Sequence, residues 1–377
     1  MGGLANGISR FYSIASEKKD IEGYLKDSCL LMALSVFAVG IIAMIIIISL
    51  KVAGYSYLLG LAAAAFVFSA LTGCNTALNG IQAAARQRAI VALHDGMNIC
   101  FKICLSAIMI FYFGASSTVI MIAYGLSILL TTSSQLFFSA KLLQLRKINF
   151  SKVAMTGNWR KQIWSFSWPF ASWGLFTWAQ LASDRWALQA FTVTHEVGQY
   201  AVALQLGYTP IGIVTGLVVS FIGPILYQRS GAATDYNRNA SVHRLTWRLT
   251  WLSLAMTVFV FLITLLLHER IFQLLVAGSF RQSSWLLPWM VLSGGLFSVG
   301  QVLSLKFMSE MKTAAMATVK IGTALLGIVC NVFGAWQFGT TGVVAGLLIF
   351  SILYLAWIAW LATMRAQASS QVLADAK

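Results

Sequence analysis

Charge is scarce in this sequence, and acidic charge is the scarcest. Only 10% of the 377 residues are Asp, Glu, Lys or Arg, whereas soluble domains carry about 25%. Hydrophobic residues make up 59% of the chain, and the mean hydropathy is +0.79. This composition excludes an ordinary soluble domain and indicates a protein that crosses a membrane several times.

Long polar stretches are also missing, so the chain has no room for a soluble domain between its apolar runs. A bilayer crossing needs about 20 apolar residues, and the runs of that kind are 29–50, 57–79, 90–113, 118–140, 163–183, 198–226, 247–267, 285–308, 314–335 and 341–363. They are too long and too evenly apolar for barrel strands. We therefore expect an all-α polytopic membrane protein with about ten transmembrane helices.

Acidic residues number 11 against 26 basic ones, which gives a net charge of +15. In a soluble protein this excess would suggest nucleic acid, but in membrane proteins Lys and Arg collect in the cytoplasmic loops. The loops on the opposite side hold only Lys51, Arg185, Arg270 and Arg281. The pattern predicts that the N-terminal segment and the C-terminus are both cytoplasmic, and it predicts no nucleic-acid partner.

Two cations, Lys102 and Lys320, lie inside predicted helices. The helix face that holds Lys102 also carries Arg88, Asp95, Asn98 and Ser106, with His94 at its edge. Such a stripe points into the bundle or into a water-filled cavity. Two interpretations stay open: Lys102 lines a substrate path, or it only pairs with Asp95 two turns away.

A short internal repeat relates the helices of the two lysines. "FGASS" begins at Phe113 and "FGTTG" at Phe338, and each is followed by "SIL". The repeat predicts two parallel lobes related by an axis along the membrane normal, with an N-terminal lobe at 1–140, a cytoplasmic linker at 141–162 and a C-terminal lobe at 163–377. Lys320 then corresponds to Asp95, and we expect this pair to form a gate or an ion pair.

Other polar and small residues mark further helix faces. Trp173, Thr177, Gln180 and Asp184 share a face of the run 163–183, and Asp184 with Arg185 is predicted to end that helix as a second candidate gate. Gly212 and Gly216 are predicted to allow close helix approach. The five cysteines, all in apolar runs, are expected to be small buried hydrophobic residues, because no ligand set joins them at metal spacing.

These motifs resemble the Wzx-type polysaccharide flippases of the MATE/MOP exporter superfamily. "WSFSWPF", "SDRWAL" and "EVGQYAVALQL" look like the seventh and eighth helices of that family, and "GLANGISRFY" looks like the end of its second helix. The most specific piece is Asp184-Arg185 followed by Gly198-x-Tyr200. The resemblance covers nearly the whole chain and implies twelve helices in two lobes. We therefore expect an N-terminally truncated member, with four helices and a stub in the first lobe and six in the second.

The resemblance implies a translocase that flips undecaprenyl-diphosphate-linked oligosaccharide, an O-antigen, capsule or exopolysaccharide repeat unit, across the bacterial cytoplasmic membrane by alternating access. Its partners would be this lipid-linked oligosaccharide, the bilayer, and glycan polymerase and chain-length proteins. Cations for the diphosphate would be Lys102, Lys320 and Arg88; groups for the sugar would be Asn98, Gln180, Thr177, Asn331 and Gln205. No catalytic residue, metal or cofactor is expected.

Three alternatives stay open. An ion-coupled antiporter for cationic drugs would share the fold but would use buried carboxylates, of which Asp95 is the one clear candidate. A membrane glycan polymerase or ligase would need a large outer loop with catalytic groups, and the longest outer link is the short segment 268–284. A scaffold without transport would not need the polar stripes. The sequence leaves coupling to protons or sodium undecided.

Overall fold

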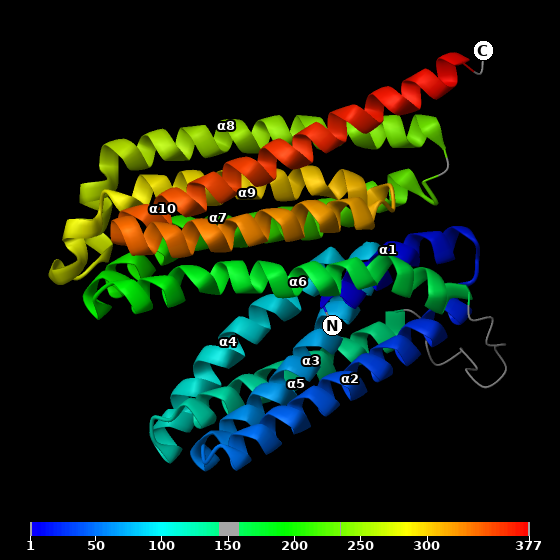
Figure 1. The fold of residues 1–377 in the computed structure, drawn as a ribbon. Coiled ribbons are helices and arrows are strands. Elements are labelled where there is room, and N and C mark those ends of the chain that lie inside the picture. Colours follow the sequence, from blue (N-terminus) through cyan, green and yellow to red (C-terminus); the bar gives the residue numbers. More distant parts are fainter. Residues whose placement is uncertain (1, 143–157, 234, 376–377) are drawn as a thin grey trace. The chain divides into compact units, whose positions relative to one another are not determined.

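The computed structural model describes residues 2–142, 158–233 and 235–375, and every regular element within them is a helix (Figure 1). The elements are α1 Gly2–Glu17, α2 Ile21–Val52, η1 Ser56–Leu58, α3 Leu59–Ala84, α4 Arg88–Phe113, α5 Ser117–Leu142, α6 Asn158–Phe191, α7 Thr194–Ser230, α8 Tyr236–Leu275, η3 Gly278–Ser283, α9 Leu286–Ser309 and α10 Thr313–Asp375. The predicted all-α fold is confirmed.

Each predicted apolar run lies within a helix, to within a residue or two at its start. Eight helices of the described residues are long and apolar enough to cross a membrane. One of them, α10, contains the last two predicted runs, and Gly339 interrupts it with a non-helical backbone (φ 58°, ψ −137°). The exception is α6, which is too polar to be among the eight. The chain is therefore a multi-pass membrane protein.

The helices are longer than the apolar runs that predict them. α7 has 37 residues and α8 has 40, whereas about 20 cross the hydrocarbon core. The side chain of Asp235 accepts the backbone N–H groups of Asn237 and Arg238, so α8 begins early. The prediction that Asp184 ends its helix is wrong, because α6 continues to Phe191.

The chain forms two compact units, Met1–Ala171 and Ser172–Lys377, which divide within α6. Unit 1 is built around α3, which contacts α1, α2, α4 and α5. The first turn of α6 is held by α2 and its N-cap residue Asp20: Trp159 Nε1 donates to Asp20 Oδ2 (2.6 Å), and Asp27 Oδ2 accepts the N–H of Arg160 (3.0 Å). Residues 143–157, most of the predicted linker, lie outside the described residues.

Unit 2 is built around α9, which contacts α7, α8 and α10 and is buried along most of its length. Its neighbours approach closely where glycines replace side chains. A Cβ added at Gly207 of α7 would lie 2.7 Å from Met290 Cβ. No atom of the described residues lies within 4 Å of a Cβ at Gly212 or Gly216, so the prediction that these two glycines mediate close packing is wrong.

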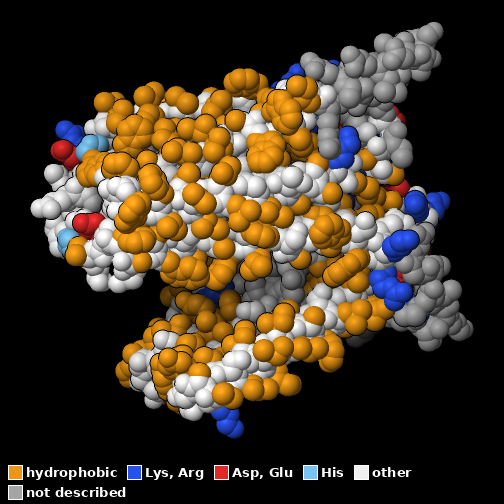
Figure 2. All heavy atoms as spheres, in the orientation of Figure 1, with side chains coloured by type: hydrophobic (Ala, Val, Ile, Leu, Met, Phe, Trp, Pro, Cys, Tyr) orange, Lys and Arg blue, Asp and Glu red, His pale blue; other side chains and the backbone are white. Residues whose placement is uncertain are grey.

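Apolar side chains cover the lengths of the helices, and charged side chains collect near their ends (Figure 2). Many of these apolar residues are exposed, including Phe37, Ile45, Phe111 and Leu266. In water such a surface would drive aggregation, but in a bilayer it faces lipid. Cys29, Cys100 and Cys104 are exposed as well. The expectation that all the cysteines are buried is therefore wrong, since apolar runs here supply the lipid-facing surface.

Candidate functional site

Lys102 of α4 lies against two aromatic rings of unit 1. Its Nζ is 5.2 Å from the ring centroid of Phe68 in α3 and 5.6 Å from that of Tyr124 in α5. A cation over an aromatic face is attracted by the ring quadrupole. Among the described residues no ion pair joins Lys102 to Asp95. The structure therefore does not contain the ion pair between Lys102 and Asp95 that the second interpretation requires.

Asp95 instead ends a chain of side-chain amides that sequence reasoning missed. Asn79 Nδ2 donates to Asp95 Oδ1 (2.9 Å), and Gln135 Nε2 donates to Asn79 Oδ1 and to Gln82 Oε1. Asn75 Nδ2 donates to Gln135 Oε1 (2.7 Å). Positions 75, 79 and 82 share one helix face, and that spacing was the available signal. The chain links α3 to both α4 and α5.

The other members of the α4 stripe also face the interior of unit 1. The hydroxyl of Ser127 in α5 lies 2.8 Å from Asn98 Oδ1. Arg88 is half-buried, and its Nε has no hydrogen-bond partner among the described residues. His94 is buried and contacts the carbonyl of Ile90 and the hydroxyl of Ser134, which indicates a structural role.

Lys320 of α10 has a similar environment in unit 2. Its Nζ is 5.1 Å from the ring centroid of Trp173 and 5.5 Å from that of Tyr354, and it donates to Gln301 Oε1 (2.8 Å). The side chain is only 8% exposed. No carboxylate pairs with it among the described residues. In each unit, therefore, a lysine side chain lies among the helices with its ammonium group over two aromatic rings.

Gln180 and Asn331 lie together on buried faces of α6 and α10. Asn331 Nδ2 donates to Ser183 Oγ (2.9 Å) and contacts the backbone oxygen of Gln180 (3.4 Å). Gln180 is 1% exposed, and neither atom of its carboxamide has a partner among the described residues; the same holds for Asn331 Oδ1. Unpaired buried amides are costly, and they are free to bind a polar ligand.

Asp184 and Arg185 point in different directions, although they were predicted to act as a pair. Asp184 is buried and its Oδ2 accepts the hydroxyl of Tyr200 (2.6 Å), whereas Arg185 is exposed. Thr177 is half-buried, and Gln205 is exposed on α7. Asp95 and Lys320 belong to different units, so their pairing stays a prediction.

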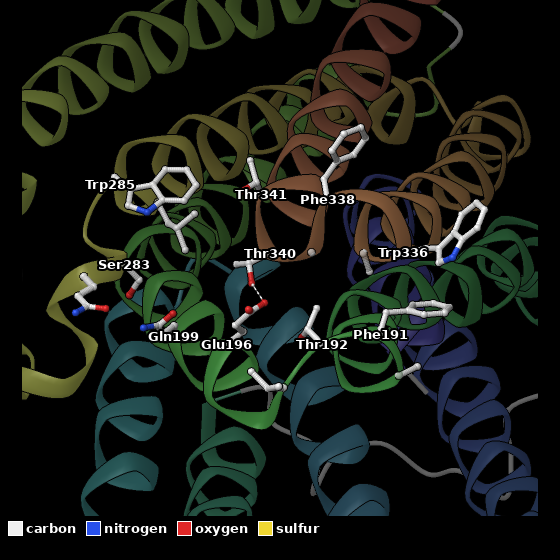
Figure 3. Close-up of a pocket in the computed structure, with 16 residues that line it drawn as sticks. Phe191, Thr192, Glu196, Gln199, Ser283, Trp285, Trp336, Phe338, Thr340 and Thr341 are labelled. Atoms are coloured by element: carbon white, nitrogen blue, oxygen red, sulfur yellow. Dashed lines mark hydrogen bonds between the residues drawn. The ribbon is translucent and has the colours of Figure 1, made fainter.

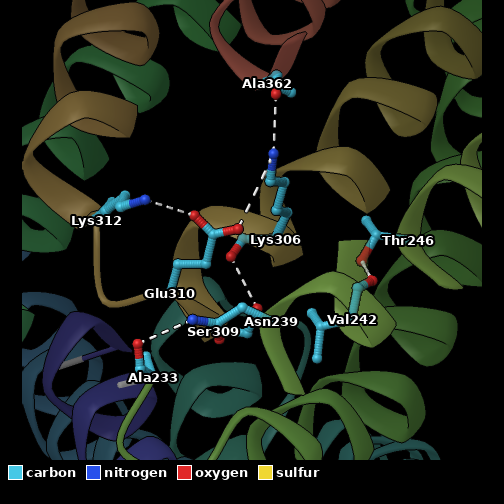
Figure 4. A network of polar contacts seen from close by, with 9 residues as sticks. All are labelled: Ala233, Asn239, Val242, Thr246, Lys306, Ser309, Glu310, Lys312 and Ala362. Atoms are coloured by element: carbon cyan, nitrogen blue, oxygen red, sulfur yellow. Dashed lines mark hydrogen bonds and ion pairs between the residues drawn. The ribbon is translucent and has the colours of Figure 1, made fainter. Parts of the chain in front are cut away.

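Lys306, at the predicted cytoplasmic end of the run 285–308, is a buried residue of α9. Its Nζ donates to the backbone oxygen of Ala362 in α10 (2.9 Å) and lies 4.0 Å from Glu310 Oε1 (Figure 4). Glu310 Oε2 in turn accepts Lys312 Nζ at 2.8 Å. This network ties the α9 terminus to α10, so Lys306 acts in packing.

Three comparisons bear on this arrangement. The model of a family described as polysaccharide biosynthesis protein matches residues 2–229. Comparison with curated proteins gives no match. Among solved structures, a mutant of the Vibrio cholerae MATE transporter VcmN matches with a TM-score of 0.78 at 15% identity, over 98% of this chain and 84% of that one.

Two further structures extend the likeness in fold. An outward-facing multidrug resistance MATE family transporter of the MOP superfamily matches with a TM-score of 0.73 at 17% identity, over 98% of this chain and 85% of that one. A MOP superfamily transporter from Pyrococcus furiosus, described as having a binding pocket of reverse polarity, matches with a TM-score of 0.66 at 18% identity, over 96% and 84%. The chain therefore has the MATE fold.

Proposed function

This chain belongs to the polysaccharide biosynthesis protein family, and we propose that it flips undecaprenyl-diphosphate-linked oligosaccharide across the bacterial cytoplasmic membrane by alternating access. The C-terminus is cytoplasmic in this proposal, because the basic residues favour that side. The glycan is an O-antigen, capsule or exopolysaccharide repeat unit. Glycan polymerase and chain-length proteins would act on the delivered product.

The pair of intramembrane lysines, Lys102 and Lys320, is the observation that carries the proposal. A lysine at the centre of a membrane helix costs roughly 2.5–3.5 kcal/mol. Contact with aromatic faces offsets part of that cost, by about 2 kcal/mol when the cation is desolvated, and it leaves the positive charge unneutralised. A lysine ammonium has three donors, and one of those of Lys320 is used by Gln301. The remaining donors and the charge suit an anionic diphosphate.

Amide groups further along α6 and α10 suit the sugar. The carboxamide of Gln180 is unpaired, as is the side-chain oxygen of Asn331, and both kinds of group exchange hydrogen bonds with hydroxyls. In unit 1, Asn98 lies one turn from Lys102 on α4 and completes a similar set. Thr177, Gln205 and Arg88 extend the proposed path.

Reconstitution in vesicles tests this function. The full chain is reconstituted with lipid-linked oligosaccharide extracted from producing cells, and the fraction accessible to an added glycosidase is followed with time. We expect Lys102→Gln and Lys320→Gln to slow translocation at least tenfold, whereas Lys51→Gln, at an exposed helix end, leaves it unchanged. Unchanged translocation in both lysine variants would contradict the proposal.

A cation antiporter is the second candidate, and one observation favours it. Asp95, expected to be a buried carboxylate, is instead exposed on α4, where a cation can reach it, with Asn79 as its hydrogen-bond donor. Transport of a fluorescent organic cation by the same vesicles, abolished by Asp95→Asn and insensitive to Lys102→Gln, would establish the antiporter in place of the flippase.

A further inference from the structure

A cavity of about 900 Å³ opens at one end of unit 2 (Figure 3). It lies where α6 turns into α7, where η3 leads into α9, and where Gly339 interrupts α10. The buried Lys306 network is at the other end of α9. In the proposed orientation, the cavity therefore opens on the outer side of the membrane.

One part of the cavity wall is aromatic. Phe191, Trp285, Trp336 and Phe338 line it and are 49%, 44%, 60% and 67% exposed. Their rings present apolar faces that no other described side chain covers fully. Tryptophans at a membrane interface commonly form a belt towards lipid headgroups, but these line a hollow together with polar groups.

The rest of the wall is aliphatic or polar, and its polar side chains are uncharged except for one carboxylate. The polar side chains come from Thr192, Glu196, Gln199, Gln282, Thr340 and Thr341. Glu196 Oε2 accepts the hydroxyl of Thr340 (3.3 Å), and Figure 3 shows the two side chains meeting in the pocket. A carboxylate has about four acceptor sites, so Glu196 keeps most of its capacity for a ligand hydroxyl.

The turn at Gly339 allows this side of the pocket to form. Its positive φ of 58° suits glycine, and a Cβ there would lie 3.5 Å from Glu196 Oε2. The carboxylate therefore lies beside a backbone surface without side chains.

We propose that this pocket binds the sugar part of a glycan as it reaches the outer side of the membrane. A pyranose ring has an apolar C–H face, which stacks on an indole, and a rim of hydroxyls, which bond to carboxylate, amide and threonine groups. The cavity falls within the range of small-molecule sites, about 300–1,000 Å³. The pocket has no cation to hold a diphosphate among its lining residues. The proposal deepens the flippase function and rests on it for the source of the sugar.

Binding of a lipid-free glycan tests the pocket. Mild acid releases the soluble oligosaccharide from the lipid-linked pool of producing cells, and saturation-transfer NMR detects its contact with the purified full chain in a detergent without a sugar headgroup. We expect transfer to the sugar C–H protons, reduced at least fivefold by Trp336→Ala and by Glu196→Gln. The matched control Trp251→Ala removes an equally exposed tryptophan (63%) from α8, outside the pocket, and should not reduce the transfer.

Each outcome decides the question. No transfer to the wild type, or equal transfer in the pocket variants and the wild type, overturns the pocket; loss only in Trp251→Ala assigns the sugar to another surface and overturns it too. Glu196→Gln is isosteric, so it keeps the test valid where Trp336→Ala unfolds the chain. Wild-type vesicles that translocate lipid-linked substrate while the free glycan gives no transfer would reject the pocket and leave the flippase function intact. Binding of the free glycan by a wild-type protein that does not translocate the lipid-linked substrate would support the pocket and reject the flippase function.

Discussion

Arg86 and Met311 adopt the same left-handed backbone conformation, with φ of 65° and 60°, at corresponding points of the two units. Arg86 follows α3 and Met311 follows α9. The hydrogen bonds correspond as well: Gln87 N donates to Gln82 O, as Lys312 N does to Phe307 O. Both ends form the Schellman motif, in which the left-handed residue closes a helix.

A second pair of corresponding residues with positive φ follows further along each unit. Gly114, which ends α4, has φ of 83°, and Gly339, which interrupts α10, has φ of 58°. These are the glycines of "FGASS" and "FGTTG". The internal repeat predicted from short motifs is therefore present in the backbone of both units.

Replacing Met311 tests the cost of its left-handed conformation. A side chain with a Cβ is strained there by about 1–2 kcal/mol, and glycine is not. We expect Met311→Gly to be more stable than Met311→Ala by about 1 kcal/mol. The measurement is thermal unfolding of both variants in the same detergent, and the alanine variant controls for the lost side chain. Equal stability would contradict the prediction.

Gly207 and Gly212 form a matched pair on α7. Alanine at Gly207 would place a Cβ 2.7 Å from Met290 Cβ, whereas alanine at Gly212 meets nothing within 4 Å. Overpacking costs about 1–3 kcal/mol, so Gly207→Ala should lower the unfolding temperature. Gly212→Ala should leave it unchanged or raise it. Equal unfolding temperatures for the two variants would contradict this account of the packing.

Gln135 is the shared partner of the amide chain in unit 1, bonded to Asn75, Asn79 and Gln82. Gln135→Leu would remove the donor to Asn79 Oδ1 and Gln82 Oε1 and the acceptor of Asn75 Nδ2 from this network, at a cost of about 1–3 kcal/mol. Thr76→Val is the control, because the exposed Thr76 hydroxyl donates to the carbonyl of Thr72 in its own helix and takes no part in the amide chain. Thermal unfolding should separate the two variants, with Gln135→Leu clearly less stable.

Lys306 and Lys312 both contact Glu310 but differ in exposure. The side chain of Lys306 is 3% exposed and that of Lys312 is 42% exposed. Lys306→Ala removes the donor to the Ala362 carbonyl and should cost about 1–3 kcal/mol. Lys312→Ala should cost less than about 1 kcal/mol, as exposed ion pairs do. A larger loss in Lys312→Ala than in Lys306→Ala would refute this assignment.

Much of the fold could be predicted. The apolar runs were each found in a helix, and the resemblance to the polysaccharide flippases is confirmed by the family match over residues 2–229. Helix ends were predicted poorly, since residues 158–162 and 184–191, outside the predicted run, continue α6. Hydropathy identifies the part of a helix that can lie in lipid. Where the helix ends depends on how its terminal N–H and C=O groups are hydrogen-bonded.

The amino-acid sequence alone determined the class of protein, because a bilayer accepts long apolar segments only as helices. It also indicated that Lys102 and Lys320 lie far from the ends of the segments that hold them. Tertiary structure decided what each lysine contacts: Phe68 and Tyr124 for Lys102, Trp173 and Tyr354 for Lys320. It likewise decided that Gly207, and not Gly212, packs closely. The physical reason is the same in each case. The partners lie on other helices or, for Tyr354, in the part of α10 that follows its interruption at Gly339. Which faces meet depends on packing that no single helix specifies.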